Sequence, residues 1–264
     1  GLAAEVRDER LSEEVRGLLG LGGVIVTSNS TAKRLSALGV PRDRIHVVIP
    51  GTVFGIAPGQ RNAGLSSKLA DSDEGRSGPY LLCVATLTLR KGQDLLVEAL
   101  ARLRGLPWQA LIVGSLTRDP DFAARVKQRV DQLGLKHRIQ FIGEISSDQL
   151  SALYFSADLF VLPSWYEGYG MALTEALWHG LPVISTTGGA IPETVPAGAG
   201  RLVPPGDVAA LGAALADFLE SEELRQRASE VALAHAAGLP DWQTQSRRFA
   251  EALVSLAANP SKGQ

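Results

Sequence analysis

Short apolar runs alternate along the chain with longer stretches in which apolar residues recur every three or four positions. Runs of strand length lie at residues 23–28, 45–51, 80–85, 109–114, 139–142, 158–163 and 182–186. Stretches with helical periodicity lie between them at 31–39, 92–104, 121–133, 147–156 and 170–179, and beyond them at 207–220, 221–235 and 241–257. Strands that are apolar throughout and separated by helices predict a parallel sheet covered on both faces. We therefore expect an α/β protein with a Rossmann-like, doubly wound sheet joined by right-handed crossovers.

Two segments fall outside this alternation. Residues 59–78 are polar and rich in glycine and serine, which is typical of a linker or loop. The opening "GLAAEVRDERLSEEVRGLLG" has the periodicity of an amphipathic helix and not the apolar core of a signal peptide. Because it begins with Gly1, we expect the sequence to start within a longer protein.

Composition narrows the classes of function. The chain has 264 residues and a formal net charge of -2, with charges of both signs interspersed, so we expect no nucleic-acid partner. The apolar runs are far shorter than a membrane span, so we expect no transmembrane segment. The single cysteine, Cys83, lies in the apolar run "YLLCVA", which leaves no disulfide framework or cysteine-based metal site and fits a reducing cytoplasm.

In an open parallel sheet, ligands bind where the strands end at their carboxyl edge. The loops that follow the five central strands are "TLTLRKG", "GSLTRDP", "GEISS", "SWYEGYG" and "TGGAIPE". Glycines such as Gly114 and Gly143 allow close backbone approach, and the first loop brings Arg90 and Lys91 to the edge. A crevice with these properties suits a nucleotide diphosphate.

The loop "SWYEGYG" leads into a predicted helix. Gly168 and Gly170 let the backbone turn tightly, and the free amides at the helix start favour an anion such as phosphate. The amides concerned are those of Tyr169, Gly170, Met171 and Ala172. Glu167 and Glu175 are separated by seven residues and bracket this turn. Because a carboxylate accepts two hydrogen bonds well, both glutamates suit sugar or ribose hydroxyls.

These motifs resemble those of a known family. "PSWYEGYGMALTEALWHGLPVIST", followed by "GGAIPE", resembles the signature of retaining, nucleotide-sugar-dependent glycosyltransferases of the GT-B type, family 4, with its two glutamates seven residues apart. "CVATLTLRKGQDLLVEAL" resembles the family's phosphate-binding strand and loop. "VIVTSNSTAKRLSALGVPRDRIHVVIPGT" resembles the last segment of the family's N-terminal domain.

The resemblance implies roles for individual residues. Lys91 contacts the donor diphosphate, Glu167 contacts the transferred sugar, and Glu175 binds the ribose hydroxyls. Many family members carry an arginine where this chain has Thr86, so either Arg90 substitutes for it or phosphate binding depends on Lys91 and the helix. The expected catalytic set is thus Glu167, Lys91 and Arg90. The expected donor-binding set adds Glu175, Gly168 with the four amides after it, Gly114, and Gly143, Glu144 and Ile145 near the base.

The resemblance also implies a domain plan. Residues 1–52 would be the tail of an N-terminal acceptor domain, 53–236 the nucleotide-sugar domain, and 237–264 a C-terminal crossing helix. The rest of the acceptor domain is expected in the same or a second polypeptide. The partners are a nucleotide-sugar donor and an unidentified acceptor, with no cofactor and no metal. The expected location is the cytoplasm, with peripheral attachment to the inner face of the membrane left open.

Other interpretations have less support. A non-catalytic nucleotide-sugar-binding module that needs a partner chain stays open as an alternative. An oxidoreductase is disfavoured because no G-x-G-x-x-G follows a first strand. "DPD" imitates a metal motif, but Asp119 is expected to cap a helix that begins at Pro120. His179 is expected to complement a helix dipole, and Trp242 to anchor the terminal helix. Trp165 and Tyr166 could flank a base or sugar or simply pack.

Overall fold

The computed structural model describes residues 17–18, 20–52 and 78–258. The chain divides into two compact units, one of residues 1–53 with 240–264 and one of residues 54–239. Nearly all of the predicted opening helix and of the linker at 59–78 lies outside the described residues. The assignment of residues 1–52 to an acceptor domain stays a prediction.

The larger unit contains a parallel sheet with helices on both sides, so the predicted fold class is confirmed. Within the described residues six strands pair in the order β5-β4-β3-β6-β7-β8. Their bounds are β3 (Tyr80–Val84), β4 (Gln109–Val113), β5 (Ile139–Gly143), β6 (Leu159–Leu162), β7 (Val183–Thr186) and β8 (Gly200–Val203). The five central strands were predicted; β8 was missed.

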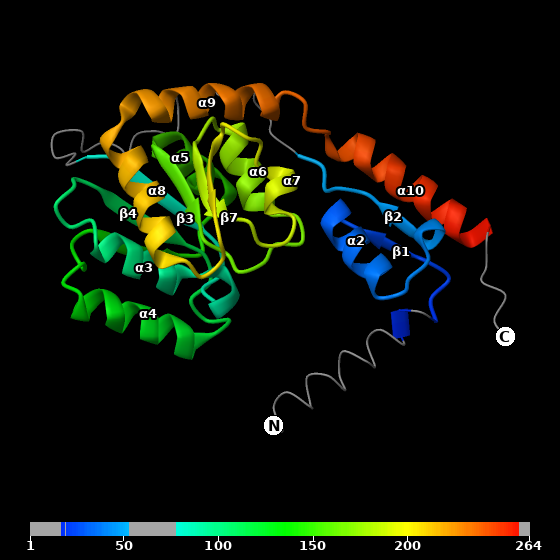
Figure 1. Cartoon of the computed structure of the whole chain (residues 1–264), viewed down its shortest axis with the longest axis horizontal. Helices are drawn as coiled ribbons and strands as arrows, with labels where there is room; N and C mark the ends of the chain where they lie inside the picture. The colour runs from blue at the N-terminus through cyan, green and yellow to red at the C-terminus, as the bar shows by residue number, and fades with distance from the viewer. Residues whose placement is uncertain (1–16, 19, 53–77, 259–264) are drawn as a thin grey trace. The chain divides into compact units, whose positions relative to one another are not determined.

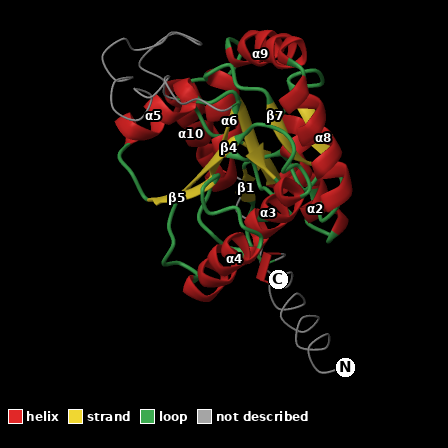
Figure 2. Ribbon diagram, turned by 90° about the vertical axis from the view of Figure 1, so that its left-hand side faces the viewer, coloured by secondary structure: helices red, strands yellow, loops and turns green. Residues whose placement is uncertain are grey.

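Helices cover both faces of this sheet. They are α3 (Gln93–Ala101), α4 (Pro120–Gln132), α5 (Ser147–Ser156), α6 (Met171–Trp178), α7 (Ile191–Thr194), α8 (Val208–Glu220) and α9 (Glu222–Ala236). In one layer α3 packs beside α4 and α8, and in the other α6 contacts β6, β7 and α9 (Figure 1). Figure 2 shows the strands between α5 and α8. The short helix α7 was not predicted.

The core explains why the strands are apolar throughout. All four residues of β6 and of β7 are buried, as expected for strands covered on both faces. Cys83 in β3 is also buried, and burial raises the pKa of its thiol to about 12. The thiol therefore stays protonated and acts as core packing, as predicted.

The order of the strands places a topological switch point between β3 and β6. From β3 the chain proceeds outward through β4 to β5, and then returns to pair β6 with the other side of β3. The register aligns Leu81 with Leu159, so both strands end at the same edge. Crevices outside the carboxyl ends of strands at such a point are where open α/β sheets bind ligands.

The smaller unit has its own sheet. Within its described residues, β1 (Val24–Val26) pairs in parallel with β2 (Ile45–Val47), next to α2 (Asn29–Ala37). Both strands are shorter than predicted. The terminal helix α10 (Trp242–Ala258) returns to this unit, where the Thr52 amide donates to the Pro240 carbonyl over 2.9 Å. The Trp242 side chain is 42% exposed, so the ring does not anchor the helix as expected; its backbone packs against Gly51 instead.

The hydropathy of the helices shows whether any of them could cross a membrane. Of the residues that the structure describes, none forms a helix with the length and apolar character needed to span a bilayer.

Candidate functional site

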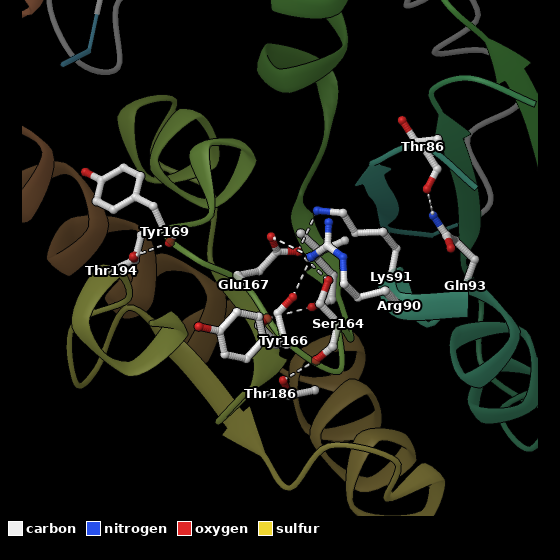
Figure 3. Close-up of polar contacts among 12 residues, drawn as sticks. Thr86, Arg90, Lys91, Gln93, Ser164, Tyr166, Glu167, Tyr169, Thr186 and Thr194 are labelled. Carbon is white, nitrogen blue, oxygen red and sulfur yellow. Dashed lines mark hydrogen bonds and ion pairs between the residues drawn. The ribbon is translucent and has the colours of Figure 1, made fainter. Parts of the chain in front are cut away.

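A buried carboxylate lies at the switch point and is surrounded by hydrogen-bond donors. Glu167 Oε1 is 2.6 Å from Lys91 Nζ and 2.6 Å from Ser164 Oγ, and Glu167 Oε2 is 3.4 Å from Arg90 NH1 (Figure 3). The side chain of Lys91 is 17% exposed and that of Arg90 is 52% exposed. Lys91 is therefore the better shielded of the two cations, and its ion pair with Glu167 is screened least by solvent.

The loops after β3 and β6 are tied together by their backbones. The first forms a short 3-10 helix, Leu89–Lys91, and turns into α3 at Gly92, whose φ is 70°. A side chain on Gly92 would collide with the Pro163 carbonyl at 2.2 Å. The Trp165 amide donates to the Arg90 carbonyl over 2.8 Å. The cations of one loop are thus held at a fixed place beside the carboxylate of the other.

A third loop, which follows β7, is hydrogen-bonded to the loop that carries Glu167. Thr186 Oγ1 donates to the Ser164 carbonyl over 2.5 Å, and the Ala190 amide donates to the Glu167 carbonyl over 2.8 Å. Gly189 has a φ of 66°, and a side chain there would approach the Glu167 carbonyl to 2.3 Å. Ser164, Thr186 and Gly189 were not predicted as supports, although the "TTGG" at the end of a strand could have signalled a tight backbone approach.

Helix α6 begins beside this cluster. Its N-cap is Gly170, with a φ of 95°, which an L side chain rarely adopts. Glycine supplies no capping side chain, so no side chain at the N-cap competes with an anion for the first amides of the helix. The preceding backbone is fixed because Thr194 Oγ1 donates to the Tyr169 carbonyl over 2.6 Å. Burial raises the pKa of the Tyr169 phenol, which keeps it protonated.

The second motif glutamate has different surroundings. Glu175 Oε2 accepts a hydrogen bond from the Tyr154 hydroxyl over 3.0 Å. Burial raises the pKa of Glu175, and the hydrogen bond from Tyr154 partly offsets that rise. No contact joins Glu175 to the Lys91–Glu167 cluster within the described part of the chain. The structure therefore brings together Arg90, Lys91 and Glu167, and leaves Glu175 apart from them.

The remaining predicted positions line neighbouring loops. Gly114 has a φ of 138°, and a side chain there would meet the Ala85 carbonyl at 2.2 Å, so it permits the loops after β3 and β4 to approach. Gly143 has a φ of 81° and ends β5. Glu144 is exposed, while Ile145 packs against the core. Of these, only Gly114 has a close backbone contact that requires glycine.

Two candidates are resolved by their local structure. Asp119 caps α4, its carboxylate accepting from the Phe122 amide over 3.0 Å, as predicted. His179 lies at the C-terminal end of α6, as expected, and its Nδ1 donates to the Glu175 carbonyl over 2.7 Å. Burial lowers the pKa of the ring, so His179 complements the helix end through this hydrogen bond. The described residues contain no group of three or more side chains suited to a metal ion.

A pocket of about 400 Å³ lies at the opposite edge of the sheet. Asp158 and Pro182, which line it, precede β6 and β7, whereas the charged cluster follows them. The pocket also reaches Tyr154 and His179. It is therefore distinct from the switch-point crevice, where the charged groups gather.

Comparisons with known proteins agree with this arrangement. The family model described as "Glycosyl transferases group 1" matches residues 68–235. An MMP alpha-(1->4)-mannosyltransferase of Mycolicibacterium hassiacum is 29% identical over 217 residues, which cover 78% of this chain and 52% of the relative. A GDP-mannose-dependent alpha-(1-6)-phosphatidylinositol monomannoside mannosyltransferase of Mycolicibacterium smegmatis is 35% identical over 187 residues, 66% of this chain and 47% of the relative.

Solved structures match over nearly the whole chain. Anabaena HepE in complex with UDP and glucose gives a TM-score of 0.78 at 25% identity, covering 89% of this chain and 63% of that one. Sucrose-phosphate synthase from Thermosynechococcus elongatus gives 0.78 at 28% identity, covering 95% and 62%. The chain spans about half the length of the curated relatives it matches.

Proposed function

The chain belongs to the group 1 glycosyl transferases, with the GT-B architecture expected from its motifs, and we propose that it is the donor-binding part of such an enzyme. The enzyme would transfer a sugar from a nucleotide diphosphate sugar to an acceptor, with retention of anomeric configuration and without a metal. Similarity of the motif around Glu167 and Glu175 to that of retaining enzymes supports the stereochemical part of the proposal.

The observation that carries the proposal is the pair of cations at the switch point. Lys91 and Arg90 converge on Glu167 beside the N-terminus of α6. The three side chains together carry a formal charge of +1, and the helix N-terminus adds positive potential. A diphosphate that approached this edge would meet two cationic side chains and free amides, which is what an anionic leaving group needs.

A division of labour follows from the two carboxylates. The donor diphosphate would bind Lys91, Arg90 and the first amides of α6. Glu167, which pairs with both cations, would contact the transferred sugar. Glu175, one turn into α6, would accept hydrogen bonds from the ribose hydroxyls. The Glu167 carboxylate forms an ion pair with Lys91, so binding of the donor would exchange one anionic partner of Lys91 for another.

The relatives suggest which donors to test. One curated relative is named as GDP-mannose-dependent, and one similar structure holds UDP and glucose. We therefore propose UDP- and GDP-sugars as the first candidates. The base would be recognised by backbone and apolar contacts near Gly143–Ile145, as the family resemblance implies, and such contacts encode little in residue type.

Catalysis would also need an acceptor site. Positioning an acceptor hydroxyl at the anomeric carbon can lower the activation barrier by up to roughly 7–11 kcal/mol. Since the chain spans about half of its relatives, we propose that the acceptor half comes from another segment, and that this chain alone binds donor but transfers negligibly.

The test measures donor binding, donor hydrolysis and transfer, first by this chain and then after addition of an N-terminal half taken from a relative. The proposal expects binding by the chain alone and transfer only by the combined protein. Robust transfer by the chain alone would contradict the incomplete-enzyme proposal. Binding without transfer in any combination would favour the non-catalytic module.

A further inference from the structure

Tyr154 is a buried tyrosine whose hydroxyl reaches helix α6. It lies in α5, is 1% exposed, and donates to Glu175 Oε2 over 3.0 Å. The same hydroxyl is 3.4 Å from the Ala172 carbonyl, in the first turn of α6. Nothing in the sequence marks Tyr154, because it lies 21 residues before Glu175 and outside every motif.

The ring of Tyr154 is held on two sides. It stacks on Phe160 of β6 with centroids 5.9 Å apart, and on His179 with centroids 4.9 Å apart and an interplanar angle of 12°. Stacked, close-packed rings do not change rotamer freely. The hydroxyl therefore has a fixed position relative to both the sheet and α6. Burial and the neighbouring Glu175 carboxylate raise the pKa of Tyr154 well above its ordinary value, so it remains a donor.

Glu175 needs such a partner. A glutamate on a helix has several rotamers, and fixing one of them costs side-chain entropy. The hydrogen bond from Tyr154 selects one rotamer before any ligand arrives. It occupies one of about four acceptor positions of the carboxylate, so Oε1 and the remaining lone pair of Oε2 can accept from two vicinal hydroxyls.

We propose that Tyr154 is a positioning residue that presets the Glu175 carboxylate for the ribose of the donor, and so sets the preference for ribose over deoxyribose. The inference rests on the proposed function, in which Glu175 accepts from the ribose hydroxyls. Tyr154 touches no substrate; its effect passes through the single hydrogen bond to Glu175.

The test is a binding measurement with the full 264-residue chain and its Tyr154→Phe variant. The probes are UDP or GDP, whichever binds the wild-type chain more tightly, and the 2′,3′-dideoxy form of the same nucleotide. Tyr154→Phe keeps the stacked ring and removes only the hydroxyl. Affinity for the ribonucleotide should fall about threefold to tenfold, while affinity for the dideoxy nucleotide stays within about twofold. Phe155→Leu, which alters the edge contact of Phe155 on His179 but keeps the hydroxyl, should leave the ratio of the two affinities unchanged.

A double-mutant cycle sharpens the test. If Tyr154 acts through Glu175, then Tyr154→Phe combined with Glu175→Gln should lower ribonucleotide affinity no more than Glu175→Gln alone. Equal losses for both nucleotides in Tyr154→Phe would show a merely structural role and overturn the inference. The inference would also be overturned if Glu175→Gln reduced the ratio of ribonucleotide to dideoxynucleotide affinity and Tyr154→Phe left that ratio unchanged. The proposed function would survive that result. Failure of the wild-type chain to bind either nucleotide would overturn both.

Discussion

The two glutamates of one motif lie in surroundings that differ in charge. Glu167, in the loop after β6, is buried between Lys91, Arg90 and the Ser164 hydroxyl. Glu175, in α6, has a neutral phenol as its partner, and burial raises its pKa. A carboxylate between cations balances charge and can be exchanged for a phosphate, whereas one beside a neutral donor is a placed hydrogen-bond acceptor. The difference supports the proposal that the two glutamates of this motif have separate roles.

The two regions also differ in how much of the fold positions them. The Glu167 loop depends on the loops after β3 and β7, through Trp165, Thr186 and Gly189. Glu175 depends on one helix and on one side chain from α5. Changes that affect phosphate binding should therefore separate cleanly from changes that affect ribose binding.

The largest effect on nucleotide affinity is expected from removal of Lys91, the better shielded cation beside Glu167. Lys91→Ala should weaken nucleoside diphosphate binding by about 10- to 100-fold, because a hydrogen bond to a charged group contributes about 1.5–3 kcal/mol. Binding of the bare nucleoside should be unchanged, since it presents no phosphate. Titration calorimetry with both ligands measures the difference. Lys136→Ala, an exposed lysine before β5, makes the same charge change at the other edge and serves as the control. Equal losses for both ligands would remove Lys91 from the phosphate site.

A smaller effect of opposite sign is expected at Glu167. Glu167→Gln removes the anion that competes with phosphate for Lys91 while keeping the side-chain shape. Nucleoside diphosphate affinity should rise about threefold to tenfold. The gain should be smaller for a nucleotide sugar, since that ligand would lose the contact of Glu167 with its sugar. Competition binding with the two ligands tests this. A weaker affinity for the diphosphate alone would show that Glu167 orders the cations more than it competes with the phosphate.

Because the Glu175 carboxylate is partly buried, the free energy of unfolding of the protein should depend on pH. Because its pKa is raised in the folded protein above the ordinary value of 4.5, ionisation of Glu175 opposes folding. Stability relative to the protonated form is thus lost as the pH rises through the raised pKa. Glu175→Gln does not titrate, so the variant should gain free energy of unfolding relative to wild type as the pH rises above 4.5. Urea unfolding at several pH values measures this, and a difference between the two proteins that does not vary with pH would refute it.

Much of the larger unit could be predicted because its strands are buried on both faces. β6 and β7 read as continuous apolar runs for that reason. β8 escaped prediction because it is a four-residue edge strand that begins with a glycine and includes exposed Arg201. The smaller unit was harder, since only three residues of each of its strands pair.

Part of the site could be predicted because some of its residues lie in loops that follow predicted strands. Arg90 and Lys91 lie in the loop after β3 and Glu167 in the loop after β6, so the pairing of these two parallel strands places them at one edge. Ser164, Thr186 and Tyr154 could not be predicted in the same way. Thr186 meets Ser164 across 22 positions and Tyr154 meets Glu175 across 21, and such pairs depend on register and rotamer, which local patterns do not encode.

The smallest effect is expected from chelation. Cationic side chains and a helix N-terminus would do the work of a divalent ion at the phosphates, so nucleoside diphosphate affinity should be the same with and without EDTA. Binding assays in each buffer check this. An affinity that collapsed in EDTA and returned with Mn²⁺ would require Asp119 and Asp121 to be reconsidered.

If the two glutamates bind different parts of one nucleotide, a crystal structure of the chain with UDP or GDP will show it. We expect phosphate oxygens within hydrogen-bond distance of Lys91 Nζ and the first amides of α6, with the ribose hydroxyls on Glu175. A nucleotide bound elsewhere, such as in the pocket at the opposite edge of the sheet, would contradict it, as would a phosphate on the Glu175 side of the site.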